Sequence, residues 1–264
     1  EQLSELVKTP ADIKELEGAL LTLAVSGKLV PQDKKEGTAD DLCVKIKERH
    51  TRAVDSGTLR KKSGKDVLPV TVEETPFDIP KSWKWVKLND IGTTNIGLTY
   101  SPNDIAKIGT PVLRSSNVQN DQIDLRDLVR VKKDIKSSVL VNDGDLLICA
   151  RNGSKALVGK TAMIRNLDEK MAFGAFMALY RSECNSYVEI FLKSPIYRNL
   201  LDGVSTTTIN QITQDNLKNT LIPLPPFGEQ KRIVKKVEEV MSLINKLRDV
   251  IGKNVTGTRG RPKK

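Results

Sequence analysis

A chain of 264 residues can form one large domain or two small ones, and no apolar run approaches the roughly 20 residues that a membrane-spanning helix needs. The chain carries 43 Lys and Arg against 33 Asp and Glu, a formal net charge of +10, which favours a polyanionic partner. Only 4% of the residues are aromatic, which argues against a single-strand binding surface built on base stacking.

Two helices are expected in the first 75 residues, which we assign to an N-terminal helical region with a linker. Residues 1–30 carry an apolar stripe at heptad-like spacing and end near Gly27, because glycine is typical of the position after a helix. The stripe consists of Leu6, Ile13, Leu16, Leu20 and Leu23. Residues 39–60 form a second, highly charged helix that we expect to be exposed or lightly docked. The polar residues 61–75 read as the linker.

From residue 76 to residue 222 the pattern changes to short apolar runs separated by turn signals, which indicates strands. The expected strands are residues 111–114, 128–131, 145–150, 157–164 and 173–180. A short helix at about residues 188–201 interrupts them. We therefore predict an α+β fold, with one strand-rich domain flanked by long helices of the coiled-coil type.

Residues 223–253 are expected to form a long helix. Pro225 and Pro226 cannot lie inside a helix and mark its start, and Gly252 is a plausible stop. Its apolar residues follow spacings of 4-3-4-3-4, a heptad stripe. They are Ile233, Val237, Val240, Ile244, Leu247 and Ile251. The stripe needs a partner, either the core of its own domain or another helix in a coiled-coil spacer, and the strict heptad favours the spacer.

The positive charge is concentrated toward the C-terminus. Residues 1–75 carry 13 basic and 14 acidic groups, residues 76–227 carry 19 and 15, and residues 228–264 carry 11 and 4. We expect the strand-rich domain and the tail to face a polyanion. Residues 254–264 form a basic tail of disordered composition. Within it, Arg-Gly-Arg-Pro at 259–262 resembles a minor-groove A·T hook, although a solvated basic tail is the ordinary alternative.

Three short motifs approach known chemical signatures without completing them. Residues 154–161 lack the first glycine of a phosphate-binding loop, and a strand rather than a helix is expected after them. Residues 224–227, Leu-Pro-Pro-Phe, have leucine where amino-methyltransferases need Asn or Asp. The Glu-x-Lys spacing at Glu229 lies in the first turn of a helix without an upstream Asp, so a capping or solvent-exposed role is expected for Glu229.

Catalytic and metal sites are not predicted. One histidine, His50, cannot support a His-based triad or a metal site, and three scattered cysteines without a Cys-x-x-Cys argue against zinc. Cys43, Cys149 and Cys184 also favour a reducing compartment over a disulfide framework.

Three polar clusters offer the paired donors and acceptors that reading of base edges requires. They comprise Arg114, Ser115, Ser116, Asn117 and Gln119; Arg151, Asn152, Ser154 and Lys155; and Thr206, Thr207, Thr208, Asn210 and Gln211. Each cluster has an ordinary alternative. The first could hold an ion pair through its arginine, the second could be a hairpin turn, and the third a helix cap with its loop. The nearby Lys132, Lys133 and Lys136 suit phosphates or water instead.

Several segments carry a family resemblance. Residues 224–234, Leu-Pro-Pro-Phe-Gly-Glu-Gln-Lys-Arg-Ile-Val, followed by the heptad helix, resemble a conserved region of type I restriction–modification specificity subunits. Residues 23–32 resemble the end of the partner helix in that family, and residues 79–88 the start of its target recognition domain. Shorter matches at 143–148, 153–155, 158–160 and 173–176 resemble the interior of that domain. Such subunits usually carry two recognition domains, so this chain resembles half a subunit.

The resemblance implies a non-enzymatic, sequence-specific reader of double-stranded DNA. It further implies docking to adenine methyltransferase (modification) subunits, and to a motor–nuclease subunit for restriction, in the cytoplasm of a bacterium or archaeon. S-adenosylmethionine, ATP and Mg²⁺ are then expected on those partners and no cofactor on this chain. In relatives with two recognition domains the helices pair within one chain. Here we expect the heptad stripes to be covered by a second copy, in a two-fold homodimer that reads an interrupted palindrome.

Two other hypotheses are compatible with the sequence. One is a structural assembly adaptor that uses the same helices without reading DNA, and the other is an enzyme with an undetected site. Salt-dependent, sequence-selective duplex binding separates the reader from the adaptor, and turnover by the purified chain alone favours the enzyme.

Overall fold

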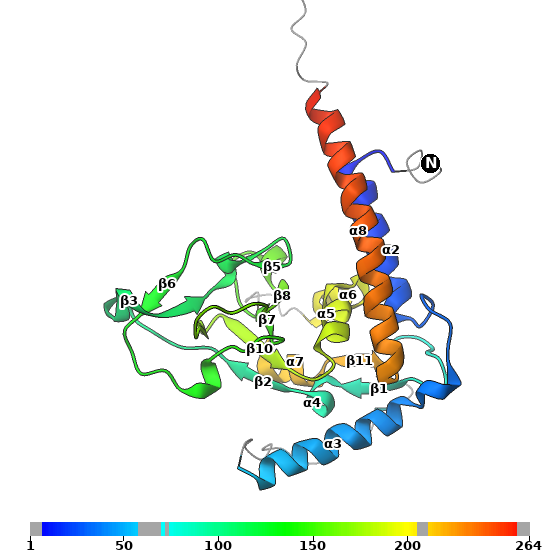
Figure 1. The fold of residues 1–264 in the computed structure, drawn as a ribbon, viewed down its shortest axis with the longest axis horizontal. Helices are drawn as coiled ribbons and strands as arrows, with labels where there is room; N and C mark the ends of the chain where they lie inside the picture. Colours follow the sequence, from blue (N-terminus) through cyan, green and yellow to red (C-terminus); the bar gives the residue numbers. More distant parts are fainter. Residues whose placement is uncertain (1–6, 58–69, 72–73, 205–210, 258–264) are drawn as a thin grey trace, which may run out of the picture.

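The structure, a computed structural model, describes residues 7–57, 70–71, 74–204 and 211–257. Two helices, α2 (Pro10–Val25) and α8 (Phe227–Gly257), lie side by side and project from a strand-rich body (Figure 1). Arg248 of α8 pairs with Glu17 of α2, and Arg232 near the start of α8 binds Glu36 beyond the end of α2. The two helices are therefore antiparallel, and we call the pair the stalk.

The stalk helices begin where the sequence offers N-terminal signals. Thr9 accepts a hydrogen bond from the backbone of Asp12, whose carboxylate accepts one in return, and Pro10 occupies the first turn of α2. α8 begins directly after Pro226, where the prolines indicate a start, but four residues later than the expected bound at 223, because residues 223 and 224 belong to a strand. It continues to Gly257, so the expected stop at Gly252 is wrong; a glycine inside a helix costs about 1 kcal/mol, which the flanking turns tolerate.

α2 covers the predicted apolar stripe of α8 within the same chain. The stripe residues are buried or half-buried: Ile233, Val237, Val240, Ile244, Leu247 and Ile251. The expectation that a second copy must cover this stripe is therefore wrong. On α2, Leu20 is buried and Leu16 half-buried, but Leu23 is 43% exposed. Leu23 misses the interface because α2 also packs against α5 and α6, which turns its buried face toward Leu21, Ala24 and Val25.

The second helix of the chain, α3 (Ala39–Asp55), lies beyond β1 on the side of the body away from the stalk (Figure 1). It starts at a Thr38–Asp41 capping box and buries only Ala39, Leu42 and Ile46. The expectation of a charged, lightly docked helix is met, with an end five residues earlier than predicted. In the part of the chain that the structure describes, no helix is long and apolar enough to cross a membrane.

The body begins and ends in one two-stranded ribbon, in which β1 (Lys84–Lys87) pairs antiparallel with β11 (Leu221–Leu224). Between them lies an antiparallel four-stranded sheet in the order β2-β10-β7-β8. Its strands are β2 (Thr93–Ile96), β10 (Met177–Arg181), β7 (Leu146–Cys149) and β8 (Thr161–Met163). The ribbon therefore closes the body at the base of the stalk.

Side-chain alternation along β7 explains how this sheet is buried on both faces. Leu146 and Ile148 point into the core shared with the helices, whereas Leu147 and Cys149 point into a second core. A second, three-stranded sheet, in the order β6-β3-β9, lies beyond that second core. It consists of β6 (Val129–Val131), β3 (Ile105–Leu113) and β9 (Ala172–Phe173). The body is thus layered as helices, four-stranded sheet and three-stranded sheet, and the predicted α+β class is confirmed.

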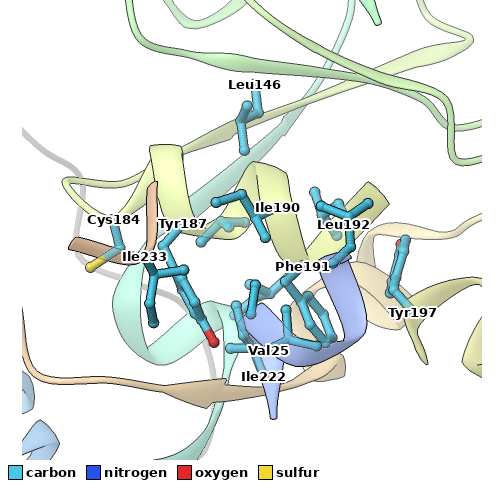
Figure 2. Close-up of a cluster of buried hydrophobic side chains, with 14 of the residues drawn as sticks. Val25, Leu146, Cys184, Tyr187, Ile190, Phe191, Leu192, Tyr197, Ile222 and Ile233 are labelled. Atoms are coloured by element: carbon cyan, nitrogen blue, oxygen red, sulfur yellow. The ribbon is translucent and has the colours of Figure 1, made fainter. Parts of the chain in front are cut away.

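Helices α5 (Asn185–Lys193) and α6 (Pro195–Val204) replace the single helix expected at 188–201. Ser194 is extended and Pro195 lacks an N–H, so one helix cannot run through this point. Figure 2 shows α5 side chains, Tyr187 and Phe191 among them, between Val25 of α2, Ile222 of β11 and Ile233 of α8. The stalk and the body therefore share one hydrophobic core.

Two expected strands are interrupted by turns. In the run at 157–164, residue 157 ends a 3₁₀ turn (Lys155–Leu157), and the strand β8 starts only at Thr161. Gly159 between them has a positive φ of 82°, which is not a strand conformation. The run at 173–180 is divided by a turn at residues 174–176. The remaining elements are short: α4 (Leu88–Ile91), α7 (Gln214–Asn219), the hairpin of β4 (Val118–Gln119) and β5 (Gln122–Ile123), and 3₁₀ turns at Lys34–Glu36, Pro102–Asp104, Ser115–Asn117 and Ser137–Val139.

Candidate nucleic-acid interface

Several strands of the body meet at one edge, where polar loops replace the apolar runs. β3 and β9 are parallel and end together at Leu113 and Phe173, while β7 ends where the antiparallel β10 begins. The backbone N–H of Gly174 donates to the carbonyl of Leu113 at 2.9 Å, which ties these strand ends together. Loops that follow adjacent strand ends lie close in space, so this edge can present side chains from distant parts of the sequence.

The edge brings members of all three predicted polar clusters together. The amide nitrogen of Asn152 lies 3.2 Å from the hydroxyl oxygen of Ser115, which joins the second cluster to the first. Arg151 forms an isolated antiparallel bridge with Gln211, and the N–H of Ile212 donates to the carbonyl of Ala150 at 2.7 Å. We call the surface formed by Ser115, Arg151, Asn152, Phe176 and Gln211 the candidate edge.

Arg151 is the exposed cation of the candidate edge. Its guanidinium carbon lies 5.3 Å from the ring centroid of Phe176, a cation–π distance. Within the part of the chain whose side chains are described, no carboxylate forms a salt bridge with Arg151. Its donors therefore remain available for the paired hydrogen bonds that an arginine makes to a base edge or a phosphate.

Asn117 and Arg114 have structural roles. Asn117 is 1% exposed: its amide nitrogen donates to the carbonyls of Asp124 and Asp127 at 2.9 and 2.8 Å, and its oxygen accepts from the N–H of Arg114. This arrangement leaves Asn117 no group for a base, so we remove it from the proposed readers. Arg114 is half-buried and pairs with Asp127 at 3.0 Å, the ion-pair alternative considered for it.

The second cluster is also partly structural. The side-chain oxygen of Asn152 accepts from the N–H of Ser154 at 2.9 Å, a local turn that limits how Asn152 can meet a base. Ser154 and Lys155 are exposed. In the first cluster, Ser116 and Gln119 are exposed and bonded to each other through the Ser116 carbonyl. Thr206, Thr207, Thr208 and Asn210 lie outside the described residues.

The lysines proposed for phosphates lie away from the candidate edge. Lys132 follows β6 at the end that pairs with Ile105, and its N–H donates to the carbonyl of Asp104 at 2.8 Å. Lys133 donates to the carbonyl of Thr99 at 3.2 Å. Both side chains are exposed at the far end of the β3–β6 pair, and Lys136 is exposed a few residues further along the chain.

Glu229 was expected to be solvent-exposed or capping, and the structure corrects this. It is buried at the junction of stalk and body, where its carboxylate accepts from the amide of Gln32 at 2.7 Å. Burial raises the pKa of the Glu229 carboxyl. Gln32 in turn accepts from the hydroxyl of Ser82, and Arg232 binds Glu36 through two nitrogens at 2.9 and 2.7 Å. Glu229 therefore belongs to a polar junction between the helices and the body.

The described residues outside the candidate edge offer little that is reactive. Thr161 begins β8, so a strand follows residues 154–160, as predicted, where a phosphate-binding loop would need a helix. Burial raises the pKa of the Cys149 thiol, which leaves this neighbour of Arg151 a neutral, weakly nucleophilic group. Among the residues that the structure describes, no group of three or more His, Cys, Asp or Glu side chains is placed to hold a metal ion.

The comparisons with known proteins agree on one family. A family model, the type I restriction modification DNA specificity domain, matches residues 80–253, from just before β1 to near the end of α8. The chain is 29% identical over 260 residues to the type I restriction enzyme EcoAI specificity subunit of Escherichia coli, a match that covers 95% of this chain and 44% of that protein.

Two solved structures share the fold. A chain from a study of complex assembly and conformational transition in the type I R-M system aligns with a TM-score of 0.58 and 20% identity, over 94% of this chain and 54% of that one. The HsdS subunit from Thermoanaerobacter tengcongensis aligns with a TM-score of 0.51 and 17% identity, over 91% and 51%. The chain thus spans about half the length of each of these relatives.

Proposed function

The chain belongs to the type I restriction–modification DNA specificity family, whose specificity subunits are non-catalytic DNA-recognition proteins, and we propose that its body reads one half-site of a bipartite duplex target. The observation that carries this proposal is the candidate edge. There, Arg151 is exposed, has no carboxylate partner among the residues that the structure describes, and lies beside Asn152, Ser115 and Gln211. An exposed arginine held among amides and hydroxyls suits the major-groove edges of base pairs.

The proposed division of labour follows from charge and geometry. Arg151 and Gln211 act as base readers because their side chains can make paired hydrogen bonds, whereas Ser115 and Asn152 hold the loops that present them. Lys132 supplies a phosphate contact, because its ammonium group is a point charge at the exposed end of a strand pair.

We further propose that a second copy of the chain packs against the stalk. Besides the stripe that α2 covers, α8 carries a second apolar row. Leu243 is 59% exposed and Val250 57% exposed, and they flank Leu247, a half-buried residue that this row shares with the covered stripe, at spacings of 4 and 3. A two-fold pairing through this row forms a four-helix bundle with one body at each end. Such a dimer reads the same half-site twice, so its target is an interrupted palindrome.

The remaining chemistry is assigned to partners in the same proposal. Modification subunits bring S-adenosylmethionine and methylate an adenine in each half-site, and a motor–nuclease subunit brings ATP and Mg²⁺. The name of the EcoAI relative, a specificity subunit of a type I restriction enzyme, supports an assembly of this kind. Because the target and the methyltransferase act on chromosomal DNA, we place the complex in the cytoplasm.

The test begins with co-expression of the chain and cognate modification subunits, followed by sequencing of methylated adenines to define the target. Cognate and scrambled duplexes then compete for wild-type chain and for Arg151→Ala. We expect Arg151→Ala to lose about 1–3 kcal/mol of discrimination, and Lys132→Ala to weaken both duplexes alike and flatten the salt dependence.

Arg165→Ala is the matched control. Arg165 is also exposed, but it follows β8 at the opposite end of the sheet and lies 3.5 Å from Glu189. Its loss should leave discrimination unchanged. A wild-type chain that binds all duplexes equally well contradicts the reading function and supports the assembly adaptor instead.

A further inference from the structure

Phe176 is mostly exposed, so its aromatic ring gains little from burial in the core. Its side chain is 60% exposed, although Met177 and Phe173 on either side are buried. Leaving a phenylalanine in water forfeits the favourable free energy of its burial. A contact with a ligand restores this free energy, and the ring lies in the candidate edge beside Arg151.

The backbone that carries the ring is fixed on several sides. The carbonyl of Phe176 accepts from the N–H groups of both Ala150 and Arg151 at 3.0 Å, and the N–H of Ala175 donates to the carbonyl of Leu98 at 3.0 Å. Gly97 packs against the same turn so closely that an added Cβ would lie 2.2 Å from the carbonyl oxygen of Gly174. The ring is therefore displayed by a turn that is tied to the segments just after β2 and β7.

The ring also restricts Arg151. A guanidinium 5.3 Å from the ring centroid is attracted by the negative face of the aromatic system. An arginine held in this way has fewer rotamers to lose when it makes paired hydrogen bonds, so less of its binding free energy is spent on ordering.

We propose that Phe176 is a further specificity-determining residue of the DNA-reading edge. Its ring braces Arg151 for paired hydrogen bonds to a guanine, and its exposed edge contacts the 5-methyl group of a neighbouring thymine. An arginine can make paired hydrogen bonds to guanine O6 and N7, and an apolar ring can contact the thymine methyl group. Together the two side chains can therefore distinguish the bases at two adjacent base pairs. This inference rests on the proposed reading of duplex DNA and specifies which bases the candidate edge contacts.

The test uses base analogues in the target defined by methylation. Each thymine is replaced in turn by uracil, which lacks the methyl group, and each guanine by 7-deazaguanine, which lacks the N7 acceptor. At one thymine the wild-type chain should lose about fourfold in affinity, the value of one buried methyl group. Phe176→Ala should already have lost this affinity and should not respond to uracil there.

Two further variants separate the roles of the ring. Phe176→Leu keeps an apolar contact but loses the aromatic face, so it should retain most of the uracil effect and show a smaller 7-deazaguanine effect than wild type. Phe227→Ala is the matched control, because Phe227 is another partly exposed phenylalanine with a cation, Lys231, 4.8 Å from its ring centroid. It lies at the start of α8 and should leave both analogue effects unchanged.

The outcomes distinguish this inference from the function on which it rests. Selective binding by wild type together with unchanged analogue effects in Phe176→Ala refutes the role of Phe176 and leaves the reading function standing. Selective binding in which no thymine responds to uracil also refutes it. Wild-type binding without any sequence preference refutes the reading function itself. Circular dichroism of each variant checks that the fold is retained.

Discussion

Neighbouring residues of α8 face different environments, and variants at these positions separate contacts within one chain from the proposed contacts between two chains. Ile244 is 1% exposed and packs toward α2, whereas Leu243 is 59% exposed. Ile244→Ala removes a contact inside one chain. The double variant Leu243→Glu with Val250→Glu instead places two carboxylates in the exposed row, where we propose that a second copy packs.

The magnitudes follow from burial. Ile244→Ala deletes three buried carbon atoms, worth about 0.8 kcal/mol each, and the cavity that remains adds to this, so the free energy of unfolding should fall by about 2.5–4 kcal/mol. Glutamate and leucine have similar helix propensities, and exposed positions tolerate such changes within about 0.5 kcal/mol. The double variant should therefore leave the folded monomer intact while it removes the apolar row.

Urea unfolding followed by circular dichroism, with light scattering at several protein concentrations, measures both effects. Wild type should be a dimer whose unfolding midpoint rises with concentration. Ile244→Ala should remain a dimer with a lower midpoint, and the double variant should be a folded monomer with a midpoint independent of concentration. If Ile244→Ala dissociates the dimer while the double variant leaves it intact, α8 pairs between chains rather than within one. A wild-type monomer at the highest soluble concentration rules out the proposed dimer.

Three smaller predictions concern positions inside the body and its junction. Burial raises the pKa of Glu229, so its carboxyl favours folding most below the ordinary carboxyl pKa, and this contribution is lost as pH rises through the raised pKa. Glu229→Gln should therefore raise the free energy of unfolding at neutral pH. It should also make the free energy of unfolding fall less as pH rises, measured by urea titration at several pH values. Gly97→Ala should lower the free energy of unfolding, measured by thermal unfolding, by about 1–3 kcal/mol, because the added Cβ would clash with the carbonyl oxygen of Gly174. A variant as stable as wild type would show that the turn shifts without cost. Asn117→Ala should cost about 1–3 kcal/mol in urea unfolding through the carbonyls it leaves unpaired, whereas the exposed Gln119→Ala should cost almost nothing.

Patterns that depend on a single element were read correctly from the sequence. The heptad stripe from Ile233 to Ile251 is the buried face of α8, and the apolar run at 145–150 contains β7. Both follow from the period of side-chain direction along a helix or a strand, which needs no knowledge of the neighbours. The break at Ser194 and Pro195 was missed, although a proline at that position is a helix boundary on the same local grounds.

Features that depend on which elements meet were not accessible from the sequence. Leu23 fits the heptad of α2 but is exposed, because α5 and α6 draw the buried face of that helix to one side. Asn117 has the side chain of a base reader, yet three backbone groups around it make it part of a turn. Phe176 lies in a run that reads as a strand, and only the turn at Gly174 exposes its ring. In each case the local pattern is compatible with two environments, and tertiary packing selects one.

The shared core has a mechanical consequence for the proposed reading of DNA. Val25 of α2, Ile222 of β11 and Ile233 of α8 pack around the same α5 side chains. The hydrogen bond from Gln32 to Glu229 also joins α8 to the segment that follows α2. Because interiors at crystal-like packing density deform little, the stalk cannot pivot on the body without opening this core. In the proposed dimer, the helices then fix the distance between the two candidate edges, as the proposed reading of two half-sites at one spacing requires.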